Sequence, residues 1–445
     1  MSETIIIKGA RLIDPSNATN SDGDVLIRDG SIVPVSDRIP SEAIVVDGTG
    51  LVCSPGFIDL HTHLREPGFE DKESIATGTA AAAAGGFTTV CAMPNTDPVI
   101  DAATVVDFIA QQARAAGPIR VLAFGAVSKG RNGEQLTDME ELARAGVVGF
   151  TDDGSPVATG HLMEMALLYA TQLGLPVMDH CEDHSITRGL GINEGRVASR
   201  LGLAGYPAAG EESIIGRDIA VLGLTGGHFH VAHLSTAGGV EMVRSARKRG
   251  LHVTAEVTPH HLTMTDDWII GTHGASSASD PLTTLAYDTR AKVSPPLRAN
   301  ADRDALIAGL IDGTIDAIAT DHAPHTFGDK AVPFDEAAVG ISVLETAFAS
   351  AMSLVHSGLV DLPTVIQRLT TGPAEVLGDR FAQIATLAYG SPADLVLFDP
   401  NEEWMVDPMT FRSKGKNTPL AGVTMRGKVK LTIARGQIAY DGIGL

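Results

Sequence analysis

Basic residues and cysteines are scarce in this 445-residue sequence. Lys and Arg number 33 against 54 Asp and Glu, so the formal net charge is −21, and no basic run is present. These counts exclude a general surface for nucleic acid or anionic membranes, and an anionic substrate would need a local cation or a metal. Cys53, Cys91 and Cys181 lie far apart without a CxxC pair. They predict neither a disulfide framework nor a thiolate zinc site, and they favour a reducing cytoplasm.

Targeting signals and long apolar segments are also missing. The first residues, Met1-Ser2-Glu3-Thr4, lack the basic and apolar regions of a secretory signal, so we expect none. The alanine-rich stretch 79–84 is too short to span a bilayer. With 44% hydrophobic and 20% charged residues, the chain can bury a large core, which excludes disorder as its main state.

The two ends of the chain share a β-rich pattern. Apolar runs at 4–8 and 25–33 end in glycine-bearing turn signals. Near the C-terminus, 394–398 is a predicted strand, and 422–434 with 437–440 is a predicted hairpin. We predict that residues 1–54 and 388–445 together form one small composite β-sandwich domain.

The middle of the chain, residues 55–387, alternates eight short apolar runs with helical stretches. The expected strands are 57–60, 87–92, 121–124, 147–150, 177–178, 229–232, 253–257 and 315–319. The expected helices include 74–84, 103–115, 160–173, 213–222, 238–249 and 303–311. This alternation predicts an α/β fold whose parallel sheet closes into a (β/α)8 TIM-like barrel. Residues just past its strands should line the functional face.

Metal-binding side chains follow several of these expected strands. His61 and His63 end the first strand, and their spacing points both imidazoles to one side. The other candidates at strand ends are Asp152, Asp153, His180, His233 and Asp321. Nitrogen and oxygen donors of this kind suit zinc, and burying them without a partner would be costly. Because four histidines with two aspartates exceed the needs of one tetrahedral ion, we predict two ions that share a bridging ligand.

The remaining histidines favour structural roles. His228 and His230 have the strand parity opposite to that of His233, so they should point away from it. His260 and His261 follow the seventh expected strand. For these two, satisfied hydrogen bonding is favoured over metal ligation.

A set of collinear motifs resembles the dihydroorotases of the amidohydrolase superfamily. The stretch 55–68, PGFIDLHTHLREPG, matches the dihydroorotase signature. Further matches are MPNT at 93–96, TDDG at 151–154, HCED at 180–183, HVAHLS at 230–235 and ATDHAPH at 319–325. The resemblance implies a barrel with a small β-sandwich. It also implies the reversible, zinc-dependent conversion of dihydroorotate to N-carbamoyl-L-aspartate in pyrimidine synthesis.

The resemblance also implies a ligand set. His61 and His63 would hold one zinc with Asp321, and the second zinc would be held by His180 and His233. Many relatives bridge the two ions with a carboxylated lysine, but this chain has no lysine near residue 150. It is therefore similar to the bacterial branch that uses aspartate. Spacing favours Asp153 as the bridge, with Asp152 as the alternative.

Asp321 is the expected proton carrier of the reaction. It would take the proton of the attacking water and pass it to the leaving nitrogen, and its alternative role is that of a plain ligand. Arg65 would hold the free carboxylate of the substrate through two hydrogen bonds. The alternative for Arg65 is a salt bridge at the rim of the site with Glu66 or Glu70.

Further residues are expected around the substrate. His63, Asn95 and His325 would complete the pocket, although Asn95 could instead be a turn former. Two substrate-contact positions depart from the family pattern: Ser294 stands where Asn is usual, and Val339, before Gly340, stands where Phe is common. The loop 326–339 is expected to close over the ligand, and the long stretch 271–285 has no assigned role.

Two other functions compete with this interpretation. Hydantoinases and allantoinases lack the arginine of the His-x-His-Leu-Arg pattern. A noncatalytic scaffold for aspartate transcarbamoylase would have lost metal ligands that this chain keeps. We expect a small anionic substrate and a homo-oligomer, with an aspartate transcarbamoylase complex as a further hypothesis.

Overall fold

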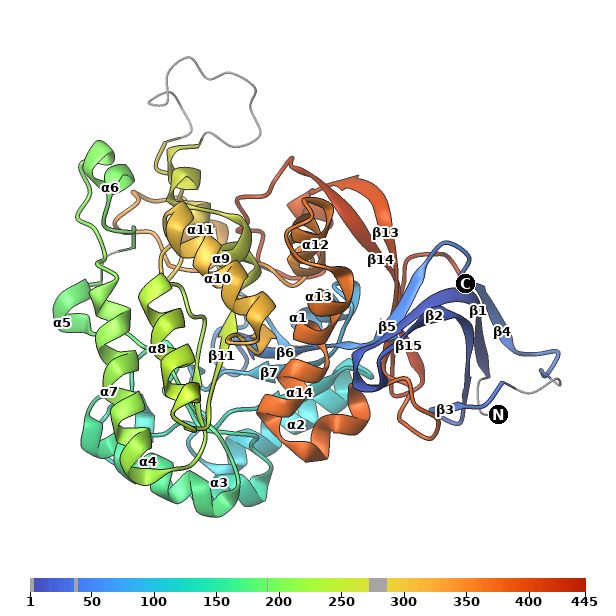
Figure 1. Ribbon diagram of the computed structural model, residues 1–445, viewed down its shortest axis with the longest axis horizontal. Helices are drawn as coiled ribbons and strands as arrows, with labels where there is room; N and C mark the ends of the chain where they lie inside the picture. Colours follow the sequence, from blue (N-terminus) through green and yellow to red (C-terminus); the bar gives the residue numbers. More distant parts are fainter. Residues whose placement is uncertain (1–3, 36–38, 190, 272–285) are drawn as a thin grey trace.

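The computed structural model describes residues 4–35, 39–189, 191–271 and 286–445. Apart from Gly271, the stretch 271–285 therefore lies outside the described residues. Strands from both ends of the chain lie side by side in one sheet, which we call the terminal sheet (Figure 1). Its members are β1 (Ile5–Asp14), β2 (Thr19–Arg28), β3 (Ser31–Val33), β4 (Ile44–Asp47), β5 (Val52–Pro55), β13 (Leu395–Met405), β14 (Thr424–Ala434) and β15 (Gln437–Asp441). The strand order is β15-β14-β13-β5-β1-β2-β3, and β4 pairs with β1.

The expected C-terminal hairpin is present, since β14 and β15 pair antiparallel. The expected turn at Gly9 is wrong. Instead, β1 continues through it, and its register with β2 shifts between Ile7 and Ala10. Gly9 has a φ of +68°, which a glycine in a β-bulge adopts readily. The expected strand 25–33 is divided by a turn at Gly30 into the end of β2 and the short β3.

The middle of the chain builds two parallel sheets. One has the order β6-β7-β8, and the other has the order β12-β11-β10-β9. Their bounds are β6 (Phe57–Thr62), β7 (Phe87–Ala92), β8 (Arg120–Ala123), β9 (Val177–Asp179), β10 (Phe229–Val231), β11 (Val253–Val257) and β12 (Ala317–Ile318). Parallel bridges between Thr62 and His322, and from Phe150 to both Gly125 and Val177, link the two sheets.

The expected strand 147–150 is therefore wrong as a regular strand, because only Phe150 forms bridges there. Gly146, which precedes it, has a φ of +108°, outside the extended region that a ladder requires. Phe150 still hydrogen-bonds to Pro176 and Met178 on one side, and its neighbours Gly149 and Thr151 hydrogen-bond to Gly125 on the other. The segment therefore keeps its place between β8 and β9.

Helices surround these strands (Figure 1). They are α1 (Ile75–Ala84), α2 (Ala103–Ala116), α3 (Met139–Ala145), α4 (Gly160–Leu173), α5 (His184–Thr187), α6 (Arg196–Leu201), α7 (Ala209–Thr225), α8 (Ala237–Lys248), α9 (Pro259–Thr263), α10 (Asn300–Asp312), α11 (Phe327–Lys330), α12 (Ala347–His356), α13 (Leu362–Leu369) and α14 (Thr371–Leu377). The predicted range 160–173 coincides with α4, which Thr159 caps at its start and Gly174 ends in a left-handed conformation. No helix in the described ranges has both the length and the apolarity to cross a membrane.

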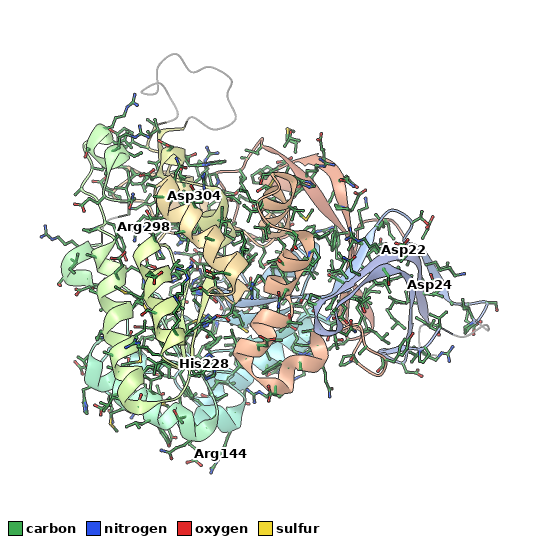
Figure 2. The ribbon with its side chains drawn as sticks, viewed as in Figure 1. Asp22, Asp24, Arg144, His228, Arg298 and Asp304 are labelled. Carbon is green, nitrogen blue, oxygen red and sulfur yellow. The ribbon has the colours of Figure 1, made fainter. Side chains whose placement is uncertain are left out.

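Phe57 joins the terminal sheet to the parallel strands. Its ring stacks on Phe348 at 5.3 Å and also lies close to Phe87 and Phe398. Only Gly56 separates β5 from β6. The terminal sheet therefore leads directly into the strand that carries the first histidines. In Figure 2, Asp22 and Asp24 lie on the terminal sheet, whereas His228 and Arg298 lie among the helices and parallel strands.

Candidate active site

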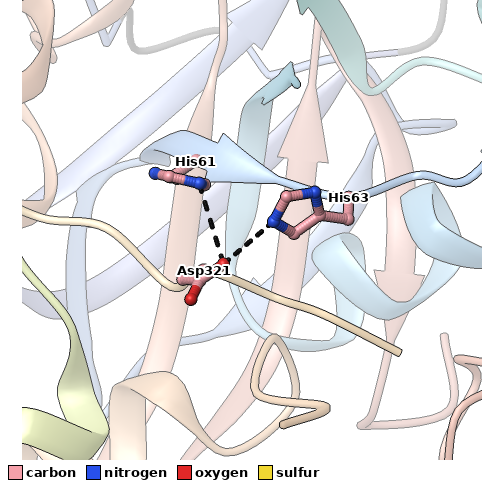
Figure 3. Close-up of side chains that lie close together, drawn as sticks. All are labelled: His61, His63 and Asp321. Carbon is pink, nitrogen blue, oxygen red and sulfur yellow. Dashed lines mark hydrogen bonds and ion pairs between the residues drawn. The ribbon is translucent and has the colours of Figure 1, made fainter. Parts of the chain in front are cut away.

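The structure brings all the predicted metal-binding positions except Asp152 to one end of the parallel strands. His61 lies in β6 and His63 follows it, while His180, His233 and Asp321 follow β9, β10 and β12. Figure 3 shows His61 and His63 directed toward Asp321. The side chains that gather here are His61, His63, Asp153, His180, His233 and Asp321, and all six residues are buried.

Asp153 lies at the centre of this cluster. Its Oδ1 is 3.3 Å from His61 Nε2, 3.6 Å from His233 Nε2 and 3.7 Å from His180 Nδ1. Its Oδ2 is 3.6 Å from His63 Nε2. A tetrahedral zinc at about 2.0–2.2 Å from each ligand would keep two ligand atoms about 3.3–3.6 Å apart. Most of these separations therefore match ligands of shared ions.

Asp321 completes one side of the cluster. Its Oδ1 is 3.0 Å from His63 Nε2 and 3.7 Å from His61 Nε2. On the other side, His180 Nδ1 and His233 Nε2 are 2.8 Å apart.

Several atoms of the cluster have no hydrogen-bond partner. His61 Nε2, Asp153 Oδ1 and His233 Nδ1 are all buried without one among the described residues. Burying such atoms unpaired is costly, and buried carboxylates and imidazoles in proteins are commonly paired or bound to metal. The donor set and its spacing fit divalent cations.

The other ring nitrogens of three histidines face oxygen atoms. His61 Nδ1 lies 2.7 Å from Glu256 Oε1, and His63 Nδ1 lies 3.0 Å from Asn95 Oδ1. His180 Nε2 lies 3.1 Å from Glu182 Oε2. When each of these nitrogens donates its proton to the facing oxygen, the opposite nitrogen keeps its lone pair for a metal.

Charges within the cluster hold its carboxylates ionised. Burial alone would raise the pKa of Asp153, but His61, His180 and His233 hold it well below its usual value. Burial also opposes ionisation of Glu256, yet His61 and His230 lower its pKa to about 2. These carboxylates therefore stay negative at neutral pH, the form that binds or orients metal ligands.

Asp152, the alternative bridge, points elsewhere. Its carboxylate accepts hydrogen bonds from the backbone N–H of Ser128 at 3.0 Å and from its hydroxyl at 2.5 Å. Of the two neighbouring aspartates, the structure brings Asp153 alone to the histidines.

Backbone strain is concentrated at the site. Arg65, His233 and Asp321 have φ values of +62°, +31° and +47°, which residues other than glycine rarely adopt. Such conformations persist where the surrounding structure enforces them, and they are common at functional sites.

A pocket opens beside the cluster and includes every predicted substrate residue. Its lining includes His63, Arg65, Asn95, Ser294, His325, Val339 and Gly340, together with Asp153, His180, His233 and Asp321. Glu182 and His184, which were not predicted, line it as well. The two positions that depart from the family pattern thus both face the pocket.

Arg65 has no carboxylate within 4.0 Å in the part of the chain that the structure describes. Its Nε donates to the carbonyl oxygen of Pro324 at 3.4 Å, and its Nη2 lies 3.5 Å from His325 Nε2. Glu66 and Glu70 instead accept backbone N–H groups. The alternative of a rim salt bridge is therefore wrong, and the guanidinium charge lines the pocket with no ion-pair partner from the described ranges.

His325 faces Arg65 in the neutral form. Burial and the Arg65 charge lower its pKa to about 3. Its Nε2 lies 2.8 Å from the carbonyl oxygen of Val339, so it donates there. His325 therefore adds no second positive charge beside Arg65.

Comparisons with known proteins identify the family of this chain. A family model described as Dihydro-orotase-like matches residues 50–238. A protein named dihydroorotase from Anaeromyxobacter sp. (strain K) is 47% identical over 99% of both chains. The chain belongs to the dihydroorotase family. Another dihydroorotase, from Caldanaerobacter subterraneus subsp. tengcongensis, is 44% identical and covers 98% of this chain and 97% of its own.

Solved structures of related enzymes share the fold of this dihydroorotase-family chain. The L-hydantoinase (dihydropyrimidinase) of Arthrobacter aurescens superposes with a TM-score of 0.85 at 23% identity, covering 100% of this chain and 97% of its own. The dihydropyrimidinase of Brevibacillus agri NCHU1002 gives 0.83 at 24% identity, covering 99% and 95%. At such identities the likeness shows the fold alone.

The expectations for the remaining histidines of this family member hold in part. His261 is satisfied, since its two ring nitrogens face Thr258 Oγ1 and the carbonyl oxygen of Pro295. The same expectation for His260 is wrong, because both of its ring nitrogens are buried without a hydrogen-bond partner among the described residues. His230 bonds to Thr254 and to Glu256, so it supports the carboxylate that faces His61.

Glu256 was missed by sequence reasoning although a signal existed. It is a fully buried carboxylate inside the apolar run 253–257. A charged residue in a buried strand requires a partner, and that requirement alone marks it as part of a site. Its partner in the metal-binding cluster, His61, is however 195 residues away in the sequence.

Proposed function

We propose that this chain is a zinc-dependent dihydroorotase. It interconverts (S)-dihydroorotate and N-carbamoyl-L-aspartate in pyrimidine synthesis, and it acts through two ions per subunit. One observation carries the proposal: Asp153 lies within 3.7 Å of four histidines, and Arg65, which has no carboxylate within 4.0 Å among the described residues, lines the same pocket. A metal-binding cluster beside a free guanidinium suits a substrate that has both a hydrolysable amide and a carboxylate.

We also propose a domain architecture of a barrel and a β-sandwich. The bridges at Thr62 and Phe150 support a closed eight-stranded barrel within residues 55–387. The shared terminal sheet supports a composite β-sandwich domain from 1–54 and 388–445.

The three free buried thiols support a cytoplasmic location. A homo-oligomer and a complex with aspartate transcarbamoylase stay predictions.

The metal ligands would divide into two sets around a bridge. His61, His63 and Asp321 would hold one zinc, and His180 and His233 would hold the other, with Asp153 shared between them. Bound zinc would supply a hydroxide nucleophile at neutral pH and polarise the amide carbonyl.

The residues of the pocket perform the remaining steps. Arg65 binds the substrate carboxylate, with Asn95 and His325 beside it, and so fixes the ring amide next to Asp321. His63 lowers the pKa of Asp321 against the effect of burial, so the carboxylate is ionised and ready to accept a proton. It then donates this proton to the leaving nitrogen, and in the reverse direction it begins protonated.

Two alternative functions predict different assay results for the same site. A hydantoinase would prefer hydantoin or allantoin over dihydroorotate, although Arg65 would then have no carboxylate to bind. A noncatalytic scaffold would neither bind zinc nor gain activity after zinc addition. Parallel assays with dihydroorotate, hydantoin and allantoin, together with metal analysis, separate these outcomes.

The Arg65→Ala variant tests the substrate assignment. Because Arg65 has no hydrogen bond or ion pair to a metal-binding side chain among the described residues, we expect the variant to keep its zinc. We expect it to lose about 10²–10³-fold in kcat/KM for dihydroorotate. Metal content and turnover are measured on the same sample. The control is Arg144→Ala, which removes an exposed arginine paired with Glu140 on α3. Loss of zinc from Arg65→Ala would show that Arg65 is structural and would contradict the assignment.

A further inference from the structure

A segment from the C-terminal part of the chain reaches the substrate pocket. Asn417 lies between β13 and β14, and it is buried. Its Nδ2 donates to the carbonyl oxygens of Ala323 at 3.1 Å and Gly340 at 3.0 Å. Its Oδ1 accepts the backbone N–H of His325 at 2.9 Å and the hydroxyl of Ser342 at 2.8 Å. These four bonds use the full capacity of a side-chain amide.

The partners of Asn417 form one wall of the pocket. Ala323, His325 and Gly340 all line it, and they come from two backbone segments, 323–325 and 340–342. Gly340 has a φ of +139°, and a Cβ there would lie 2.7 Å from the carbonyl oxygen of Ala323. The two segments are thus in close contact, and Asn417 connects them.

The ring of His325 depends on this connection. Its backbone N–H is held by Asn417, while its Nε2 reaches the carbonyl oxygen of Val339 at 2.8 Å and lies 3.5 Å from Arg65 Nη2. A shift of segment 323–325 would move His325 and also the Pro324 carbonyl oxygen that accepts from Arg65.

The segment that carries Asn417 is itself tightly held. The Asn417 carbonyl oxygen accepts the backbone N–H of Ser342 at 2.9 Å. Ser413 donates to the buried carboxylate of Glu73. A Cβ on Gly415 would lie 2.4 Å from Pro324, so the backbone of this segment approaches the wall directly. The segment is therefore a rigid support for the wall.

We propose that Asn417 is a positioning residue that sets the affinity of the pocket for the substrate carboxylate. The proposal rests on the function proposed above, since it concerns the groups that hold that carboxylate. Asn417 itself contacts no reacting atom. It acts through the backbone of His325 and Gly340, and it fixes them relative to Arg65.

The test uses Asn417→Ala and the milder Asn417→Ser in zinc-loaded protein. We expect KM for dihydroorotate to rise about tenfold or more, kcat to change by less than about threefold, and zinc content to stay at the wild-type level. Inhibition by orotate, which has the carboxylate, should weaken by a similar factor, whereas inhibition by uracil, which lacks it, should not change. The control is Asn401→Ala, which changes an exposed asparagine in β13 whose side chain accepts a hydrogen bond from Arg426.

If Asn417 served folding alone, its substitution would lower the yield of active protein and kcat. The ratio between the inhibition constants of orotate and uracil would then stay unchanged. An unchanged KM and an unchanged ratio in a folded variant would overturn the proposal. If neither variant folds, hydrogen exchange on the wild type decides. Orotate should slow exchange in 323–325 and 340–342 together, and no change there would overturn the proposal. A wild type without dihydroorotate turnover would instead refute the proposed function.

Discussion

At the scale of single residues, the site is defined as much by the groups behind the histidines as by the histidines themselves. Glu256 faces His61 Nδ1, Asn95 faces His63 Nδ1, and Glu182 faces His180 Nε2. Each contact fixes which ring nitrogen keeps a lone pair. Asn95 therefore has a second role beside the substrate contact that the sequence suggested.

The Glu256→Gln variant tests this orientation. Gln keeps the size of the side chain but removes the negative charge beside His61 Nδ1, so we expect zinc affinity to fall about 10–100-fold. Affinity is measured by competition with a chelator, and activity should return when zinc is added in excess. Glu241→Gln, which changes an exposed carboxylate paired with Arg244, is the control. Equal affinities of Glu256→Gln and the wild type would contradict the orienting role.

The sequence predicts the residues of the cluster better than their supports. His61, His180 and Asp321 could be found because nitrogen and oxygen donors follow apolar strands whose ends meet. Spacing favoured Asp153 over Asp152, but the sequence could not remove the alternative, because the contact of the Asp152 carboxylate with Ser128 is visible only in the structure. Asn417 gave no sequence signal, since its partners lie 75 to 94 positions away.

At the scale of elements, periodicity and turn signals locate most strands and helices but not their interruptions. The predicted range 160–173 is confirmed as α4, which Thr159 caps at its start and Gly174 ends. The turn predicted at Gly9 was wrong. Glycine is common both in turns and in β-bulges, and only the pairing of β1 with β2 shows that a bulge is present here. The segment 147–150 similarly depends on its neighbours, because its backbone hydrogen bonds go to both of them while only Phe150 forms bridges.

At the scale of the whole molecule, the site draws on distant parts of the chain. β5 and β13 pair antiparallel, so the two ends of the sequence meet, and Gly56 connects this sheet to the strand of His61. Four of the cluster side chains come from segments that are 92 or more positions beyond His61, and Asn417 adds a contact from the C-terminal part. Metal binding should therefore stabilise the molecule as a unit.

Zinc binding should weaken as the pH falls. Burial alone would lower the pKa of His180, but Asp153 and Glu182 raise it to about 10 in the metal-free site. Below that pH the ring is protonated, so a metal must displace a proton, and lower pH favours the metal-free form. We expect zinc affinity to fall at least about tenfold per pH unit from pH 8 to pH 6. Zinc should also raise Tm more at pH 8 than at pH 6. A chelator competition series that shows no pH dependence would contradict this expectation.

The most direct test of the central claim is anomalous diffraction at the zinc absorption edge from crystals grown with zinc. We expect two peaks, one on either side of Asp153. One should lie among His61, His63 and Asp321, and the other should lie beside His180 and His233. Absence of any peak within this cluster, or zinc bound only at other positions, would contradict the account.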